Sequence, residues 1–169
     1  MSRTLRLVDY DPGWPQRFRA ESGRIAETLK GLAVAIEHVG STAVPDLPGK
    51  PVLDIAVAVR SEQDADACIT PIVTLGYVFR GQHGDDPRRR YYVRDREGQR
   101  TSQIHLFILP AAGWDDQLAF RNALRESRDL AEAYAAEKLR VATEVGWNKL
   151  DYSKAKGPFI ETVLASLNR

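Results

Sequence analysis

The stretch that decides the fold runs from residue 37 to residue 59 and reads EHVGSTAVPDLPGKPVLDIAVAV. It opens with a glycine-serine turn, crosses a loop interrupted by prolines, and enters a strongly apolar run that carries one acid, Asp54. Residues 52–59 are rich in β-branched side chains and too few for a typical helix, which predicts a central strand. Asp54 is then either a structural acid at the strand end or part of a site for a charged ligand.

Side chains along a strand alternate between its two faces, and this alternation determines what surrounds Asp54. The carboxylate shares its face with Ala56 and Ala58, whose small side chains leave space beside it. The opposite face carries the larger apolar side chains of Leu53, Ile55, Val57 and Val59. In the preceding turn, glycine lets backbone N–H groups approach an anion closely because it has no Cβ. A turn that satisfies only its own hydrogen bonds is the alternative interpretation.

Length and composition are those of a globular protein with one domain, expected over residues 1–169. Of these residues 43% are hydrophobic and 28% are charged, enough to bury one substantial core. The 24 basic and 23 acidic residues give a net charge of +1, so no global field favours nucleic acid or an anionic membrane as partner. Cys68 is the only cysteine, which excludes an intramolecular disulfide and favours a core position.

Neither a membrane span nor a signal peptide is predicted. No apolar run approaches the ~20 residues that a span needs, and the first residues contain arginines but no apolar segment. We therefore expect a cytoplasmic protein without a membrane partner. The sequence leaves the oligomeric state open.

Predicted helices and strands alternate along the rest of the chain. Periodicity and breakers predict helices over residues 15–29, 61–76, 114–145 and 151–167, the third in two pieces around Ser127. Strands are expected over residues 5–10, 33–41, 77–81, 89–95 and 102–109. The last two form a hairpin that turns at Glu97 and Gly98, and residues 82–90 form a loop. The order predicts an α/β or α+β fold: a small mixed sheet packed with helices, and a helical C-terminal part.

The residues around Asp54 are more specific together than separately. The segment HVGSTAVPDLPGKPVLDI closely resembles the signature of the GrpB family, H-[IV]-G-S-T-[AS]-[IV]-P-x-L-x-x-K-P-[IV]-[IL]-D-I. Elsewhere QIHLFIL is similar to the family's histidine-bearing strand, and WDDQLAFRNALR, AEAYAAEKLRVA and YSKAKGPFI are similar to its helical motifs. The resemblance extends from about Asp9 to the end of the chain, which is identified as a member of this family.

The GrpB family is similar in fold to the nucleotidyltransferase superfamily, so the resemblance implies that fold. In that superfamily an Asp-x-Asp pair holds Mg²⁺ ions against a triphosphate, and a neighbouring strand supplies a third acid. The resemblance therefore implies Asp54, His105 and Lys50 as catalytic residues, Asp54 as the metal ligand, and Mg²⁺ or Mn²⁺ as the cofactor.

This chain departs from the superfamily pattern at the second acid. The residue two positions after Asp54 is Ala56, and the strand expected to offer the third acid carries His105, with Gln103 on the same face. Magnesium prefers oxygen ligands in octahedral geometry, so one aspartate and one histidine hold it poorly without ligand oxygens. The fold is therefore expected, while transferase activity does not follow from the fold.

The other predicted site residues are polar side chains within the family motifs. They are His38, Gly40, Ser41 and Thr42 in the loop, and Arg121, Arg125, Tyr134, Lys138, Tyr152 and Lys156 on the C-terminal helices. Arginines four residues apart on a helix share a face and suit bidentate contact with phosphate or carboxylate. For the helical residues the alternative is a solvated surface. For the two histidines it is a structural role within the sheet or the turn.

Two functions of different classes remain open from the sequence. The first is an enzyme that binds a small phosphate- or carboxylate-bearing ligand, a nucleotide among them, and transfers a phosphoryl, nucleotidyl or related group. An acyl or amide-forming transfer, with Asp54 and His105 as acid and base, belongs to the same class. The second is a non-catalytic accessory or ligand-sensing domain, because GrpB-like domains also occur fused behind dephospho-CoA kinase, whose P-loop this chain lacks.

Nucleic-acid binding is the least favoured function. The run RRRYY at residues 88–92 mixes cations with aromatic rings, which is a pattern found in nucleic-acid binders. In a strand, however, Arg89 and Tyr91 point away from the face that carries the other three residues. Only part of the run can therefore meet one ligand.

Overall fold

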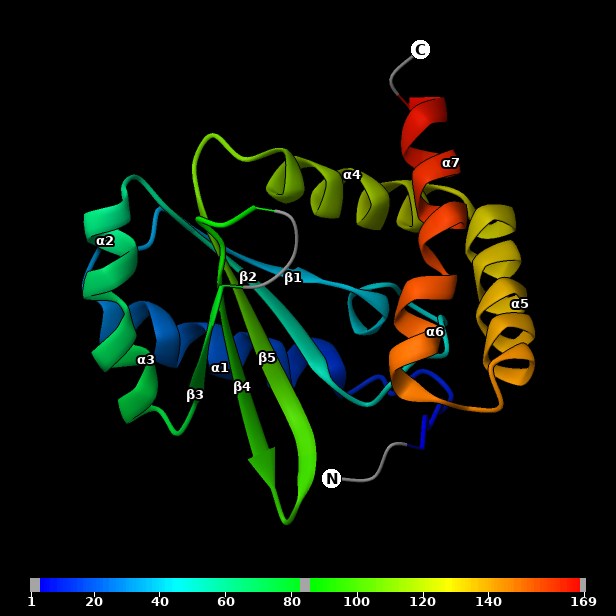
Figure 1. Cartoon of the computed structure of the whole chain (residues 1–169), viewed down its shortest axis with the longest axis horizontal. Helices are drawn as coiled ribbons and strands as arrows, with labels where there is room; N and C mark the ends of the chain where they lie inside the picture. Colours follow the sequence, from blue (N-terminus) through cyan, green and yellow to red (C-terminus); the bar gives the residue numbers. More distant parts are fainter. Residues whose placement is uncertain (1–3, 83–85, 168–169) are drawn as a thin grey trace.

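A mixed five-stranded sheet forms the centre of the structure (Figure 1). The computed structural model describes residues 4–82 and 86–167. In spatial order the strands are β1 (Ala35–Val39), β2 (Leu53–Val59), β5 (Gln99–Ile108), β4 (Arg90–Arg96) and β3 (Val78–Gln82). β2 and β5 run parallel, and every other neighbouring pair runs antiparallel. The small mixed sheet predicted from the sequence is confirmed.

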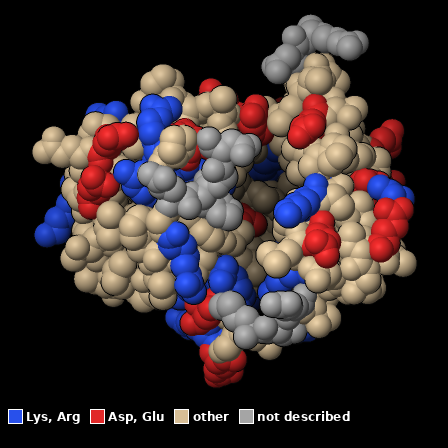
Figure 2. Space-filling model, viewed as in Figure 1, with Lys and Arg blue, Asp and Glu red and all other residues tan. Residues whose placement is uncertain are grey.

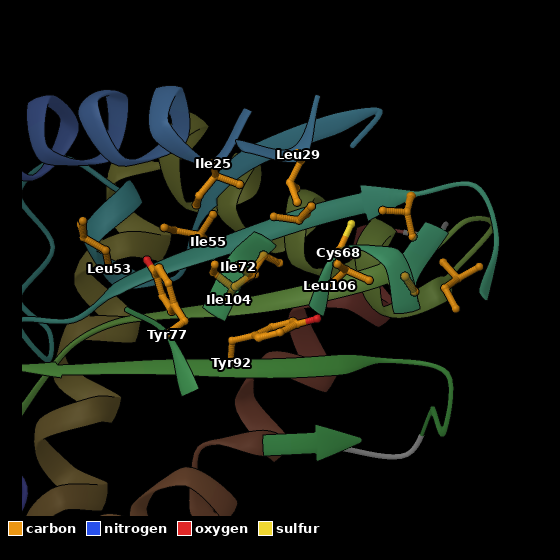
Figure 3. Close-up of a cluster of buried hydrophobic side chains, with 14 of the residues drawn as sticks. Ile25, Leu29, Leu53, Ile55, Cys68, Ile72, Tyr77, Tyr92, Ile104 and Leu106 are labelled. Atoms are coloured by element: carbon orange, nitrogen blue, oxygen red, sulfur yellow. The ribbon is translucent and has the colours of Figure 1, made fainter. Parts of the chain in front are cut away.

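Three helices enclose the main core against one face of this sheet. They are α1 (Trp14–Leu29), α2 (Glu62–Ala67) and α3 (Ile69–Thr74). Figure 3 shows Ile25 and Leu29 reaching from α1 toward Ile55 of β2, with Ile104 and Leu106 of β5 beneath them. The odd-numbered residues of β2 all belong to this core, as the alternation predicts. Burying such a side chain stabilises the fold by about 1.5–3 kcal/mol.

The C-terminal helices lie on the other side and beside the end of the sheet (Figure 1). They are α4 (Ala112–Glu126), α5 (Arg128–Glu144), α6 (Lys149–Ala155) and α7 (Gly157–Leu167). Trp114 of α4 packs on Phe107 over the small residues Ala56 and Ala58, with 6.1 Å between the ring centroids. α4 contacts α5 and α7, and α6 contacts the same two helices. Within the described residues, none of these helices combines the length and the apolar character needed to cross a bilayer.

Two predicted helices are each divided in the structure because a proline interrupts them. Residues 61–76 form α2 and α3, which meet at Cys68, and Pro71 lies in the first turn of α3. The predicted helix over residues 151–167 forms α6 and α7, with Pro158 in the first turn of α7. Proline has no N–H to donate to the preceding turn, so it is tolerated only at a helix start. The predicted division at Ser127 is confirmed, and its hydroxyl caps α5 by accepting from the Leu130 N–H at 3.2 Å.

The N-terminal prediction of a strand over residues 5–10 is wrong. The segment makes only two isolated bridges, Thr4 with Asn148 and Val8 with Gly49. Both partners lie in loops, so the segment ties two connections together without extending the sheet. The predicted hairpin turn is confirmed, with positive φ at both Glu97 and Gly98.

The core assignment can be tested with two neighbouring residues of α3. Ile72 is fully buried, whereas Val73 is 44% exposed. Ile72→Ala should lower the free energy of unfolding by about 2–5 kcal/mol, because it leaves a cavity against the sheet. Val73→Ala should change it by no more than about 0.5 kcal/mol. Chemical denaturation of the two variants measures both values, and equal losses would contradict the assignment.

Candidate functional site

The glycine-serine loop approaches β2 so closely that a side chain cannot replace Gly40. The residue has φ 72° and ψ −172°, a conformation open essentially to glycine alone. A Cβ at this position would lie 2.6 Å from Asp54 Oδ2. After Gly40 the chain forms one 3₁₀ turn, η1 (Ser41–Ala43), and Ser41 lines the same cavity as Asp54. The loop and the acid of β2 therefore lie together, which is the arrangement that the predicted site requires.

His38 fixes this loop from the opposite side of the sheet. It pairs with Ile55 across β1 and β2, so its ring faces α1, where it stacks on Phe18 with 4.5 Å between centroids. Its Nε2 lies 2.9 Å from Thr42 Oγ1. Burial, with the charge of Arg125, lowers the pKa of His38 to about 4, so the ring is neutral at pH 7. His38 thus holds the loop but lies outside the cavity beside Asp54.

Two chains of hydrogen-bonding groups converge on Asp54 Oδ1. In the first, the Tyr91 hydroxyl donates to Gln103 Oε1 at 2.6 Å, and the Gln103 amide donates to Asp54 Oδ1. In the second, Arg89 Nη2 lies 2.5 Å from His105 Nδ1, and His105 Nε2 lies 3.4 Å from Asp54 Oδ1. Because a guanidinium can only donate, Nδ1 must accept, and the ring proton of His105 is on Nε2, facing Asp54.

These contacts keep Asp54 ionised. Its burial alone would favour the neutral acid, but the hydrogen bond from His105, and then that from the Gln103 amide, outweigh the burial and lower the pKa of Asp54. The side chain remains one quarter exposed. Asp54 is therefore a reachable carboxylate with two donors fixing one of its oxygens.

The small side chain of Ala56 allows the ring of His105 to approach Asp54. Ala56 is the register partner of His105 across the parallel pair β2 and β5, and Asp54 is the partner of Gln103. The methyl group of Ala56 leaves room for the imidazole to lean toward Asp54. The position at which the superfamily pattern places a second acid is therefore next to a neutral ring.

Two lysines face Asp54 across the cavity. The ammonium groups of Lys50 and Lys156 lie 5.0 and 5.3 Å from the centroid of the buried ring of Tyr152. Burial, then the charges of Lys156 and Lys149, lower the pKa of Lys50 to about 8 despite the nearby Asp54. Burial likewise lowers the pKa of Lys156. Among the described residues neither ammonium lies within ion-pair distance of a carboxylate, although Asp54 and Asp116 line the same cavity.

Lys138 lies behind this pair and has a structural role. Its ammonium donates to Ser41 Oγ at 3.0 Å and to the Pro48 carbonyl, and so joins the two ends of the loop. Burial, with the charge of Lys156, lowers its pKa to about 7. Since Ser41 Oγ accepts from Lys138, its own hydroxyl hydrogen stays free to donate into the cavity.

Together these groups surround a cavity of about 300 Å³, which we call the Asp54 cavity. Figure 2 shows the molecule hollowed at this place, between the strands and the C-terminal helices. Beyond the polar groups already described, the cavity is lined by Val39, Asp116, Gln117, Phe120, Arg121, Leu124, Tyr134, Ile160 and Leu164. Its wall toward α4 and α7 combines the apolar side chains of Phe120, Leu124, Ile160 and Leu164 with the polar side chains of Asp116, Gln117 and Arg121. The Tyr134 ring packs edge-on against Phe120 at 5.1 Å. The cavity therefore has a charged end at Asp54, and we call the part around Phe120, Tyr134 and Ile160 its apolar end.

The structure brings most of the predicted site residues together. The lining includes Gly40, Ser41, Thr42, Lys50, Asp54, His105, Arg121, Tyr134 and Lys156. Four predicted residues stand outside it, namely His38, Arg125, Lys138 and Tyr152, and each supports a neighbouring part of the site. The two arginines separate: Arg121 bonds Glu37 at 2.6 Å and the His38 carbonyl at 2.8 Å, while Arg125 bonds the Ala43 carbonyl at 2.8 Å and lines another cavity.

Sequence reasoning did not identify Arg89, Tyr91 or Gln103 as site residues. Arg89 and Tyr91 were expected to share a strand face, and the structure confirms that both meet the Asp54 side of the sheet. Gln103 was expected on the face of His105. The sequence does not show the register of the hairpin. That register places the face of Arg89 and Tyr91 on the same side of the sheet as the face of Gln103 and His105.

The carboxylate set of two-metal chemistry is not present in the part of the chain that the structure describes. No three acidic, histidine or cysteine side chains gather there as a metal site would require. Asp54 Oδ1 already accepts from Gln103 and faces His105, so Oδ2 is the oxygen of Asp54 that stays available as a ligand atom, and Asp116 of α4 is the other carboxylate at the cavity. The residues do not fit a resident Mg²⁺ or Mn²⁺ pair, and no chemical step is assigned to such an ion here.

A sequence profile of the family described as GrpB protein matches residues 4–166. The chain belongs to this family. The UPF0157 protein PA4798 of Pseudomonas aeruginosa is 32% identical over 163 residues, which cover 95% of this chain and 66% of that protein. The crystal structure of the conserved protein GrpB from Enterococcus faecalis matches with a TM-score of 0.83 at 30% identity, over 94% of both chains. The predicted GrpB assignment is confirmed.

More distant matches include solved nucleotidyltransferase structures of similar fold and a kinase sequence. The Cid1 poly(U) polymerase with MgGTP bound gives a TM-score of 0.54 at 13% identity, over 80% of this chain and 46% of that chain. This likeness concerns the fold alone and confirms the predicted nucleotidyltransferase-like architecture. The dephospho-CoA kinase of Mycobacterium leprae is 27% identical over 184 residues, which cover 91% of this chain and 44% of the kinase.

The close approach of the loop can be tested with two glycines of positive φ. Gly40→Ala should lower the free energy of unfolding by about 1–3 kcal/mol for the backbone conformation, plus a similar amount for the contact with Asp54. Gly98 has φ 76° but open space around its Cβ position, so Gly98→Ala should show the backbone cost alone. Denaturation of both variants at one pH measures the difference. Equal destabilisation would mean that the loop does not press against Asp54.

Proposed function

We propose that this chain binds a nucleotide, or a similar small phosphate-bearing ligand, in the Asp54 cavity and transfers a phosphoryl, nucleotidyl or related group from it. The observation that carries the proposal is the pair of partly buried ammonium groups, Lys50 and Lys156, around one tyrosine ring beside Asp54. Each of these lysines has a lowered pKa, and the charge of Lys156 contributes to the shift at Lys50. A bound anion would offset the repulsion between the two ammonium groups. It would also compensate each charged group for the water that it loses on burial.

The loop supplies a donor that suits the same anion. The Ser41 hydroxyl is fixed by Lys138 at 3.0 Å, with its hydrogen free for a phosphate oxygen. Charge-assisted hydrogen bonds of this kind are about twice as strong as neutral ones. Lysines and the serine hydroxyl therefore form the anion end of the site.

The apolar end suits a base or another ring. Phe120, Tyr134 and Ile160 line it, and Gln117 adds an acceptor. Gln117 Oε1 is buried and has no hydrogen-bond partner among the described residues. Such an oxygen is costly to leave unpaired, and a rotation of this amide toward the cavity would let it accept from an amino group of a base. A charged group joined to a ring is the composition of a nucleotide, and the Cid1-like fold favours the same ligand class.

For the transfer step, Asp54 is the group best placed to meet an attacking hydroxyl. With Oδ1 held by Gln103 and His105, Oδ2 can accept a hydrogen bond from that hydroxyl and take up its proton as the new bond forms. His105 acts as a positioning residue, because Arg89 occupies its only free lone pair. The step requires an acceptor that reaches Asp54. Any Mg²⁺ or Mn²⁺ would come with the ligand phosphates and find Asp54 as its protein carboxylate.

A second candidate function is a ligand-binding domain without catalysis. Ala56 in place of a second acid favours it, as does the match to part of a dephospho-CoA kinase. In that case the same cavity binds the same class of ligand, and occupancy alone is the signal. For both candidate functions we propose a cytoplasmic location, where nucleotides are abundant.

The binding proposal is tested by thermal shift with ATP, GTP, UTP, CTP and inorganic pyrophosphate, each with EDTA, Mg²⁺ or Mn²⁺. A ligand at ~100 times its dissociation constant adds about 2.7 kcal/mol of stability. Lys156→Met should remove the shift by deleting one ammonium of the site. Lys154→Met, an exposed lysine at the end of the same helix, is the matched control and should keep it. No shift with any nucleotide in wild type would sink the proposal.

Asp54→Asn separates the two candidate functions. The change removes negative charge next to a bound anion, so nucleotide affinity should be unchanged or higher. If Asp54 takes the proton of the acceptor, product formation should fall by 10²-fold or more, as is typical for loss of a general base. Rapid-quench assays with labelled nucleotide measure turnover. Tight binding with no turnover in either protein would favour the ligand-sensing domain.

Anion affinity should depend on pH because Lys50 titrates near pH 8. The pKa of Lys50 is lowered to about 8, so this lysine is charged below that pH and neutral above it. Affinity for ATP should therefore fall roughly tenfold between pH 7.5 and 9.5, where the triphosphate itself is fully ionised. Lys50→Met should bind more weakly at pH 7.5 and show a shallower fall. Calorimetric titration measures both curves, and an equal slope in the two proteins would remove Lys50 from the site.

A further inference from the structure

A second, larger cavity meets the Asp54 cavity at the carboxylate. Its volume is about 750 Å³, and it shares Lys50, Asp54 and Gln103 with the first cavity. From there it extends toward the N-terminal segment and the β4–β5 turn, away from α4 and α7. We call it the Arg6 cavity, after the residue of the N-terminal segment that lines it. Asp54 is thus exposed to two separate spaces, each within the usual size range of a small-molecule site.

Four basic side chains and one acidic side chain are the charged groups that line the Arg6 cavity. Its cations are Arg6, Lys50, Arg100 and Lys149, and the acid at its lining is Asp54. Arg100 is balanced by Asp95 at 2.5 Å. Within the described residues, Arg6 and Lys149 form no ion pair with a carboxylate. Figure 2 shows Lys and Arg side chains gathered on this part of the face, near the β4–β5 turn.

These cations stand on anchored backbone. The Leu5 N–H donates to the Trp147 carbonyl at 2.7 Å, and Val8 exchanges two hydrogen bonds of 2.9 Å with Gly49. Arg6 lies between these two anchor points, and the buried side chain of Leu5 fixes the same segment. Lys149 begins α6 directly after its capping residue. The positive charge is therefore positioned by the fold on both sides of the cavity.

The geometry points to a second substrate in the Arg6 cavity, one that carries phosphate and a hydroxyl, so that the transfer between the two ligands takes place at Asp54. This inference rests on the proposed function, because the Asp54 cavity supplies the donor nucleotide. The acceptor phosphate lies among Arg6, Lys149 and Lys50, and its hydroxyl reaches Asp54 Oδ2. Charge-assisted contacts from several cations make a phosphate the ligand that best fits this lining.

The step balances with these two substrates alone. The hydroxyl oxygen of the acceptor attacks a phosphorus of the nucleotide, and a new P–O bond forms. The P–O bond to the leaving pyrophosphate breaks, and the hydroxyl proton passes to Asp54. Lys50, which lines both cavities, faces the donor and the acceptor at once. A shared lysine between two anions lowers their mutual repulsion and so favours their approach.

Calorimetric titration of inorganic pyrophosphate into ATP-saturated protein tests the inference. Wild type should bind one further equivalent of pyrophosphate in the Arg6 cavity. The double variant Arg6→Met/Lys149→Met should weaken that event about tenfold or more, since two charged contacts are lost. Its affinity for ATP should stay within about twofold of wild type, because neither residue lines the Asp54 cavity. Lys154→Met serves as the control for surface charge, and melting curves check that all variants fold.

The outcomes separate this inference from the proposed function. If ATP-saturated protein binds no pyrophosphate, or binds it equally well in the double variant, the inference fails while the proposed function stands. If the double variant weakens ATP and pyrophosphate together, one ligand spans both cavities and the inference also fails. If no nucleotide binds, but pyrophosphate binding depends on Arg6 and Lys149 and not on Lys156, the Arg6 cavity is an anion site, while the proposed function and the transfer at Asp54 both fail.

Discussion

The parallel pairing of β2 with β5 is the constraint on which the site depends. It fixes Asp54 beside Gln103 and Ala56 beside His105, while the intervening residues of both strands enter the core under α1 to α3. A shift of one residue would move Asp54 into that core and expose the large apolar side chains. The cost of burying an unpaired carboxylate there makes such a shift prohibitive. The core therefore holds the acid in place, and the site inherits the rigidity of the sheet.

Charge is distributed unevenly around this rigid element. Asp54 has two protein donors on one oxygen, and its pKa is lowered by them although burial opposes ionisation. Lys50 and Lys156 have no comparable partners among the described residues, and burial lowers their pKa values. The protein thus gives Asp54 two hydrogen-bond donors but gives Lys50 and Lys156 no comparable partner among the described residues. Two ammonium groups without carboxylate partners beside a partly apolar cavity are the features on which the proposal of an anionic ligand rests.

Much of the fold followed from the sequence, and about two thirds of the residues predicted for the site line the Asp54 cavity, because both depend on local patterns. Alternation along residues 52–59 places Asp54, and helical periodicity places α1, α4 and α5. His38 escaped such reasoning because its side depends on the antiparallel register of β1, which pairs it with Ile55. Prolines account for the two divided helices. The sequence shows where each proline stands but not that it falls in the first turn of a new helix.

The hairpin shows most clearly what a sequence pattern cannot supply. A regular hairpin with its turn at Glu97 and Gly98 would pair Tyr91 with Ile104 and send its ring into the core. The ladder instead shifts by one residue between Arg94 and Asp95, so that Tyr91 pairs with His105. One extra residue on β5 therefore directs Arg89 and Tyr91 to the site and Tyr92 to the core. No composition signal marks that bulge, since its stability comes from the packing of both faces together.

The same bulge contributes to a difference between this site and the metal-binding Asp-x-Asp pattern of nucleotidyltransferases. With Ala56 at the second position, a nucleotidyltransferase-like strand loses the carboxylate that shares a cation with Asp54. Arg89 then reaches His105 and fixes its proton toward Asp54, so the space is filled by a neutral donor in place of a second negative charge. A carboxylate with both donors on one oxygen still accepts a proton from a hydroxyl on the other oxygen. If the proposed transfer takes place here, the exchange of an acid for a histidine, supported by a guanidinium and a bulge, favours a site that orients a hydroxyl over one that holds two cations.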